Sequence, residues 1–308
     1  MSRTTHDLAR PVWYDDDPAR LLSDSNKVGA VICLLCQSDQ HHIVFREFGV
    51  DVLRCRACGH VFSSYNADPH YDGFWGDEVT IVDSYWSFAR ETMYRDFRRR
   101  FITGRSGRLL DMGCGLGFFI SGVAHSPGWE AYGCEISAAA VRYAREKRGL
   151  ANVCCSRPET VDLPDSSFDI ITMWDVIDHI AQPDPVIGRC HALLKRGGFL
   201  FLRTPNIKIQ LMRARINKIL KGMRPGVTFL QARDHSHHYS RSSIGRLLRR
   251  NGFETVEFVH LRPVRAPQGY SRRQQLVKDA CFAMVRAMAM LTRGRVNLDN
   301  LYVIARKG

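Results

Sequence analysis

A glycine loop between an apolar run and a helical pattern is the feature that most constrains how this chain folds. The run ends at Asp111, glycines follow at positions 113, 115 and 117, and an apolar periodic stretch begins at Phe118. Strand, tight loop and helix start in this order form a nucleotide-binding crevice, because a glycine backbone passes closely under a ligand. A dinucleotide fingerprint needs glycine at position 118, so NAD is not the expected ligand.

A second acidic residue follows the next apolar run. Residues 129–135 end in Glu135, 20 positions after Gly115. A carboxylate at this distance, on the neighbouring parallel strand, binds ribose hydroxyls. We therefore predict that Glu135 holds a ribose and that Asp111 faces an ammonium group or, through water, a sulfonium group.

Strand and helix patterns alternate along the rest of the chain. Strands are predicted near 108–112, 130–135, 152–155, 169–174, 198–203 and 255–261, with a closing strand within 298–307. Helical patterns separate most of them, which is typical of an α/β protein with a doubly wound parallel sheet.

The segment from Arg108 to Phe253 resembles the class I S-adenosylmethionine-dependent methyltransferases. The resembling stretches, in the family's order, are 111–117, 132–137, 168–180 and 193–202. The resemblance implies a seven-stranded Rossmann-like sheet with an antiparallel last strand and S-adenosylmethionine as cofactor. Arg157 stands where relatives usually place an Asp that receives the adenine amino group. The cofactor residues that the resemblance implies are Asp111, Gly113, Cys114, Gly115, Gly117, Glu135, Ile136, Glu159, Trp174 and Asp175.

Two C-x-x-C pairs precede this region. Cys33 and Cys36 form the first pair, and Cys55 and Cys58 form the second, with 18 residues between the pairs. Four thiolates at this spacing bind one tetrahedral zinc ion and leave no open position for chemistry. We expect a structural Zn²⁺ site, with a hairpin of strands at 42–46 and 50–54. This part resembles the small zinc modules that precede many bacterial methyltransferases of glycan and secondary-metabolite pathways.

These patterns predict three parts. Residues 1–28 form a polar arm, 29–66 a zinc ribbon, and 67–308 the class I methyltransferase domain, with helical insertions at 207–234 and 270–295. The expected fold class is therefore α/β, with a doubly wound seven-stranded Rossmann-like methyltransferase sheet and a small N-terminal zinc ribbon.

Histidines at the predicted carboxyl edge of the sheet are the candidate catalytic residues. A hydroxyl or amine acceptor of a methyl group loses a proton, and histidine is the side chain best suited to accept it near neutral pH. His179 follows the strand at 169–174, and His235 and His238 lie in a histidine-rich loop before a predicted N-cap at Ser240. The alternative is that His179 only packs beside Asp178.

Charge and hydropathy bear on partners and location. The formal net charge is +13, which favours an anionic partner. The stretch 207–223 is predicted to be a basic amphipathic helix, which we expect to pack as a lid over the crevice; peripheral contact with a membrane surface and binding of anionic head groups are the alternatives. The first 28 residues hold no apolar signal segment, so we expect a cytoplasmic protein.

The sequence favours methylation of a small-molecule, glycan or lipid-linked acceptor, at oxygen. Two alternatives stay open. The ribbon and the positive charge also fit an RNA methyltransferase, although nucleic acid is the less favoured partner. Arg157 in the adenine region is the feature that fits a non-catalytic binding protein. Oligomeric state is not determined by the sequence.

Overall fold

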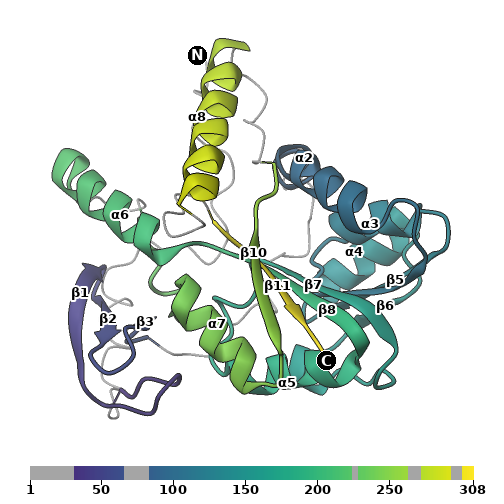
Figure 1. Ribbon diagram of the computed structural model, residues 1–308, viewed down its shortest axis with the longest axis horizontal. Helices are drawn as coiled ribbons and strands as arrows, with labels where there is room; N and C mark the ends of the chain where they lie inside the picture. Colours follow the sequence, from purple (N-terminus) through teal and green to yellow (C-terminus); the bar gives the residue numbers. More distant parts are fainter. Residues whose placement is uncertain (1–30, 66–82, 224–227, 263–271, 293–299) are drawn as a thin grey trace.

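The computed structural model describes residues 31–65, 83–223, 228–262, 272–292 and 300–308 (Figure 1). The predicted polar arm at 1–28 lies outside these residues, as does the predicted junction between ribbon and methyltransferase domain at position 66.

A seven-stranded sheet forms the centre of the molecule (Figure 1). Its strand order is β10-β11-β8-β7-β4-β5-β6. Neighbours among β4 to β8 pair in parallel, and β11 runs antiparallel between β8 and β10. The strands are β4 (Gly107–Met112), β5 (Trp129–Glu135), β6 (Val153–Cys155), β7 (Phe168–Trp174), β8 (Leu194–Thr204), β10 (Thr255–Val259) and β11 (Leu301–Arg306). The predicted doubly wound sheet and its antiparallel closing strand are confirmed.

Helices cover both faces of the sheet, because alternate residues of each central strand point to opposite sides. Leu109 and Ile170 belong to one buried cluster, and their neighbours Leu110 and Ile171 belong to the other. The helices α2 (Asp83–Phe101), α3 (Phe118–Ala124) and α4 (Ala138–Arg148) contribute to the first cluster, and α5 (Pro183–Leu193) and α7 (Arg241–Arg250) to the second. Helices thus bury both faces of the sheet, as is typical of parallel sheets.

The two cysteine pairs lie in a small antiparallel unit, residues 31–65, which we call the cysteine ribbon. It contains β1 (His41–Glu47), β2 (Val50–Cys55) and β3 (Val61–Ser63). Phe48 and Gly49 both take positive φ and form the turn of the predicted hairpin. A fourth strand, β9 (His237–His238), comes from the methyltransferase part and pairs with β3. The sheet of the ribbon is therefore completed by the predicted histidine-rich loop.

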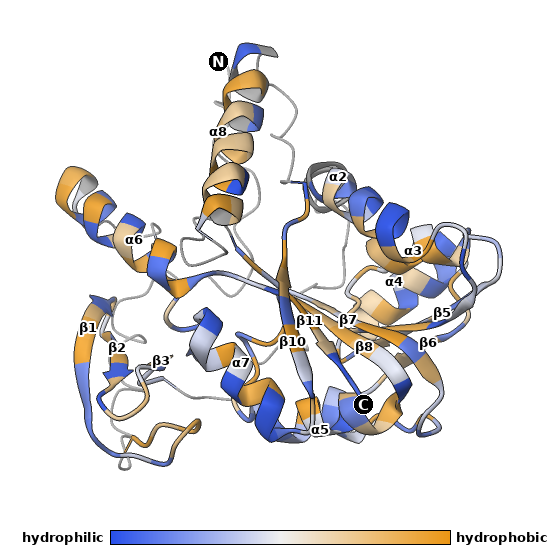
Figure 2. Ribbon diagram, viewed as in Figure 1, coloured by the Kyte–Doolittle hydropathy of each residue, from blue (hydrophilic) through white to orange (hydrophobic). Residues whose placement is uncertain are grey.

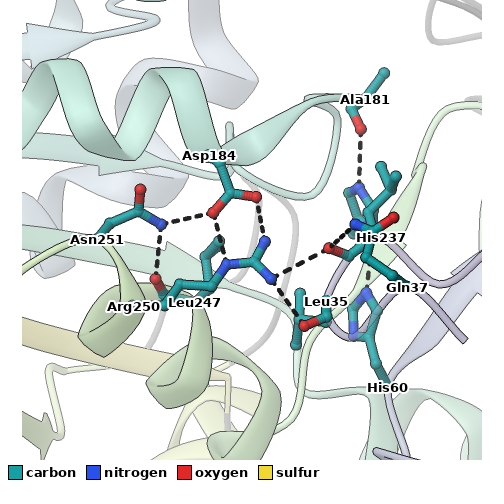
Figure 3. Close-up of polar contacts among 10 residues, drawn as sticks. Leu35, Gln37, His60, Ala181, Asp184, His237, Leu247, Arg250 and Asn251 are labelled. Carbon is teal, nitrogen blue, oxygen red and sulfur yellow. Dashed lines mark hydrogen bonds and ion pairs between the residues drawn. The ribbon is translucent and has the colours of Figure 1, made fainter.

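Buried side chains join the cysteine ribbon to the larger sheet. Leu35 and Phe62 belong to the same buried cluster as the α5 and α7 faces. His60 Nε2 lies 3.1 Å from Nδ1 of His237, whose Nε2 lies 3.1 Å from the carbonyl oxygen of Ala181. Arg250 donates to the carbonyl oxygen of Leu35 over 2.8 Å and pairs with the carboxylate of Asp184 (Figure 3).

One buried carboxylate fixes the loop that leads to β9. Both oxygens of Glu47, at the end of β1, accept hydrogen bonds from backbone N–H groups of Phe229, Leu230 and Ala232. The Ser63 hydroxyl donates to the carbonyl oxygen of Ala232 over 2.5 Å, and Ser63 N donates to the carbonyl oxygen of Ser236. The cysteine ribbon thus holds residues 229–236 through polar contacts as well as through β9.

The helix α6 (Ile207–Lys221) corrects one expectation. Ile207, Leu211 and Ala214 are buried in a cluster with side chains of β1 and β2. The apolar side chains predicted to cover the crevice as a packed lid lie on another face and are exposed. They are Met212, Ile216, Ile219 and Leu220. The lid prediction was wrong because only part of the helix is covered, and the covering surface is the cysteine ribbon.

The Glu47→Gln variant tests the role of this carboxylate. Glutamine replaces one acceptor oxygen with an N–H donor that faces backbone donors, so we expect the free energy of unfolding to fall by about 2 kcal/mol. Denaturant titration measures this loss. Glu146→Gln, at an exposed position on α4, is the matched control and should leave stability unchanged; equal stability of the two variants would contradict the assignment.

Candidate cofactor and acceptor site

The glycine loop lies at the carboxyl end of β4, as predicted. Gly113, Gly115 and Gly117 all take positive φ, which a side chain opposes. A Cβ on Gly113 would stand 2.6 Å from Val176, and one on Gly117 would stand 2.5 Å from Leu150. The glycines therefore allow both the turn and its close packing. The backbone N–H groups of Gly113 and Cys114 donate to the carbonyl oxygen of Cys134, which ties the loop to β5.

Glu135 ends β5 beside this loop. Its Oε2 accepts the N–H of Gly115 over 2.8 Å, and its Oε1 accepts the N–H of Ser137 over 3.0 Å. These bonds fix the carboxylate at the sheet edge, and a carboxylate is a group that accepts hydrogen bonds from two vicinal hydroxyls such as those of a ribose. Ser137 in turn caps α4.

Asp111, the next-to-last residue of β4, is 2% exposed. The Thr172 hydroxyl donates to Asp111 Oδ1 over 2.6 Å. Burial raises the pKa of Asp111 to about 8, the Thr172 bond opposes this rise, and the nearby charge of Glu135 adds to it. A buried carboxylate with a raised pKa is stabilised in its charged form by a cation, and a sulfonium or ammonium group meets that requirement. The carboxylates and the glycine cradle thus fit S-adenosylmethionine.

The remaining predicted cofactor residues take different positions. Ile136 follows β5 and is half-buried, and Glu159 pairs with Arg157 over 2.7 Å on the short helix η3 (Pro158–Thr160). Cys114 is buried, and burial raises the pKa of its thiol. The Trp174 side chain packs among Tyr94, Phe97, Phe119 and Phe201, and its role in cofactor binding stays a prediction.

Asp175 lies in a buried ion-pair cluster that the sequence does not predict. Arg90 Nη2 of α2 lies 2.9 Å from Asp175 Oδ2, and Arg203 of β8 pairs with the same oxygen. Burial opposes ionisation, but the charges of Arg203 and Arg90 lower the pKa of Asp175. The positive φ of Asp175 turns the chain out of β7 at this point.

His179 and His235 are brought together with Asp178. His235 Nε2 lies 3.3 Å from Asp178 Oδ2, and His179 Nε2 lies 4.0 Å from it. His179 Nδ1 is 2.9 Å from the carbonyl oxygen of Asp234, which requires a proton on Nδ1 and leaves Nε2 as the basic nitrogen. Asp178 is buried, whereas the His179 side chain is 23% exposed. The sequence predicts Asp178 only as a packing neighbour of His179, because the loop that brings His235 to Asp178 is distant in the chain.

The other histidines are more deeply buried. Burial lowers the pKa of His235 to about 4, although the charge of Asp178 acts in the opposite direction. Burial also lowers the pKa of His238 well below its ordinary value. His238 sits in β9 opposite Val61, so its backbone is part of the ribbon sheet. Of the three predicted catalytic histidines, His179 is thus the most accessible to an acceptor.

The four predicted metal-binding cysteines converge. One sulfur from each of Cys33, Cys36, Cys55 and Cys58 lies within 4.8 Å of the others. The sulfurs of Cys33 and Cys58, and those of Cys36 and Cys55, are 3.5 Å apart. Four thiolates around one point match the ligand set of a closed tetrahedral zinc site.

None of the helices that the structure describes is long and apolar enough to cross a membrane.

Known proteins share the central part of the chain. A ubiquinone biosynthesis O-methyltransferase from Rhodopseudomonas palustris is 34% identical over 127 residues, 39% of this chain and 49% of the relative. One of the same name from Neisseria meningitidis is 27% identical over 41% of this chain and 59% of the relative. This chain thus spans about half the length of these curated relatives. A crystal structure of an Archaeoglobus fulgidus SAM-dependent methyltransferase aligns with 73% of this chain and 97% of that chain, with 18% identity and a TM-score of 0.49.

The family described as "Methyltransferase domain" matches residues 85–258, from α2 through β10. The matched region contains the glycine loop, both carboxylates at the ends of β4 and β5, and the histidine cluster. Because the match covers more than half of the chain, this protein belongs to the methyltransferase-domain family.

Proposed function

We propose that this protein is an S-adenosylmethionine-dependent methyltransferase that acts on a hydroxyl group of a small-molecule, glycan or lipid-linked acceptor. The observation that carries this proposal is the position of His179, whose Nε2 is the basic nitrogen at the same sheet edge as the glycine loop. The family match supports transfer of a methyl group, and the names of the curated relatives favour oxygen as the acceptor atom.

The cofactor site uses the ends of two adjacent parallel strands. Asp111 faces the cationic part, Glu135 holds the ribose hydroxyls, and Gly113, Gly115 and Gly117 let the backbone lie against the ligand. S-adenosylmethionine supplies the electrophilic methyl group when bound. The Asp111 carboxyl, protonated at neutral pH while buried alone, ionises beside a positive charge, so Asp111 and the cofactor stabilise each other.

The acceptor side uses His179 as general base. Its Nε2 accepts the proton of the acceptor hydroxyl, and the Asp234 carbonyl holds the ring in the required tautomer. Asp178 stabilises the imidazolium that results, because its carboxylate lies 4.0 Å from that nitrogen. His235, neutral because of its low pKa, packs against the His179 ring at a centroid separation of 4.6 Å and limits its rotation.

The cysteine ribbon has a structural role in this proposal, with one Zn²⁺ ion held by Cys33, Cys36, Cys55 and Cys58. The outer edge of its strand β3 pairs with β9, which is part of the histidine-rich loop. This arrangement favours a ribbon that supports the acceptor site over one that reads RNA, the alternative function. The formal net charge of +13 favours an anionic acceptor.

Glu135→Ala tests the cofactor site. Loss of a charged acceptor for the ribose hydroxyls should weaken binding of S-adenosylmethionine by about 1 to 3 kcal/mol, measured by isothermal titration calorimetry. Glu130→Ala, on the exposed side of the same strand, is the control and should bind as the wild type does. An unchanged affinity in Glu135→Ala refutes the ribose assignment.

Metal removal tests the zinc site. We expect the purified protein to contain one zinc ion per chain and Cys58→Ser to lose it, because three thiolates no longer close the site. Hydrogen exchange should then accelerate in β9 as well as in the ribbon, since β3 and β9 share backbone hydrogen bonds. Cys281→Ser is the matched control at an exposed cysteine. A metal content that is the same in both variants argues against the site.

Transfer of label from methyl-labelled S-adenosylmethionine to a fractionated bacterial lysate tests the function itself. We expect label in the soluble or lipid fraction and a loss of about 100-fold or more in His179→Gln, with cofactor affinity retained. His42→Gln, an exposed histidine on β1, is the control and should transfer label as the wild type does. Label in RNA overturns the proposed acceptor class, and full transfer by His179→Gln overturns the base assignment.

A further inference from the structure

Two helices expose large apolar side chains to solvent. On α6, Ile219 is 84% exposed and Leu220 is 75% exposed. On α8 (Arg272–Leu291), Leu276, Val277, Met284, Met290 and Leu291 are exposed, the last to 86%. Both helices project from the body of the molecule and carry long apolar stretches (Figure 2). Side chains of this size in such groups mark a surface that contacts an apolar partner.

The exposed residues of α6 form one continuous stripe. Met212, Ile216, Ile219 and Leu220 follow the spacing of one face of an α-helix. The opposite face, with Ile207, Leu211 and Ala214, is buried against the cysteine ribbon. The ribbon thus anchors α6 by one apolar side and leaves a second apolar side without a partner among the described residues.

The charges around this stripe indicate the kind of partner. No acidic residue occurs in α6. With a rotation of about 100° per residue, Lys208 and Arg215 border the stripe on one side and Arg213 borders it on the other. Long basic side chains on both borders of an apolar stripe suit a helix that lies in the interface of an anionic bilayer, where their stems contact lipid and their charges reach phosphates.

Both helices are connected to one end of the central sheet. The strand β8 ends at Thr204, and α6 begins at Ile207. The strand β11, which α8 precedes in the chain, begins at Leu301, and Leu301 is the pairing partner of Thr204. This end of β8 is the carboxyl edge where the glycine loop and His179 lie. The helices α6 and α8 therefore project from the edge of the sheet at which the candidate acceptor site lies (Figure 1).

We propose that the exposed faces of α6 and α8 form a docking surface for an anionic lipid bilayer. A second copy of the chain is the less favourable occupant, because two α6 stripes bordered only by basic side chains repel each other. The proposal stands on exposure, charge and topology and does not depend on which group is methylated. It describes a protein that lies on the bilayer surface with its sheet edge facing the lipid.

Vesicle flotation of the full-length protein tests the docking surface. We expect the wild type to float with vesicles of phosphatidylcholine and phosphatidylglycerol, and to bind vesicles of phosphatidylcholine alone at least about tenfold more weakly. Ile219→Ser/Leu220→Ser should lower binding to the anionic vesicles by about tenfold or more, since two large apolar side chains no longer insert into the lipid. Ile32→Ser/Ile43→Ser, at exposed isoleucines of the cysteine ribbon, is the matched control and should bind as the wild type does.

Removal of two basic side chains tests the contribution of charge, and light scattering tests self-association. Lys208→Gln/Arg213→Gln should weaken binding to the anionic vesicles and remove most of its salt dependence, while all variants bind S-adenosylmethionine with wild-type affinity. Wild-type flotation of Ile219→Ser/Leu220→Ser overturns the proposal. A second result also overturns the proposal: the wild type does not bind vesicles, and light scattering shows a wild-type dimer that Ile219→Ser/Leu220→Ser abolishes. That result assigns the stripe to a second copy of the chain.

Discussion

The pairing of β3 with β9 is the constraint on which the acceptor side of this molecule depends. It joins a small cysteine-rich unit to a loop about 175 residues later in the chain, and Glu47 strengthens this contact by accepting hydrogen bonds from three backbone N–H groups. The same loop provides the Asp234 carbonyl for His179 and places His235 on Asp178. The ribbon therefore acts as a support for the histidine cluster and not as a separate module.

The cofactor side depends on a different constraint, the geometry of parallel strands. The carboxyl ends of β4 and β5 lie side by side, so an acid at the end of each and a glycine loop between them converge without further specification. Burial makes the Asp111 carboxyl hold its proton near neutral pH, and a cationic ligand removes that cost. The residues of this half lie at the ends of two adjacent strands that are close in sequence. Their convergence could therefore be predicted from their spacing along the chain.

The two halves also differ in how their charges are balanced. Asp175 is compensated by Arg90 and Arg203, which come from α2 and β8, and this cluster fixes α2 over the edge of the sheet. Asp178 has His179 and His235 as its titratable neighbours, and burial keeps His235 neutral. An ion-pair cluster of fixed charges thus lies close to one in which the Asp178 carboxylate is neutralised only when a histidine accepts a proton. That difference suits a structural role for Asp175 and a role in proton transfer for Asp178 and His179.

The sequence by itself determined the positions of the central strands along the chain, the glycine loop with its two carboxylates, the cysteine hairpin and the N-cap of α7, because each follows from spacing within one or two neighbouring elements. Tertiary structure decided which face of α6 is covered, since two apolar faces of one helix look alike until a partner surface is present. It also decided that β9 completes the ribbon sheet, that Trp174 packs in the core, and that Arg90 reaches Asp175. These contacts join residues far apart in the chain, and their registers depend on how the packed elements meet in three dimensions.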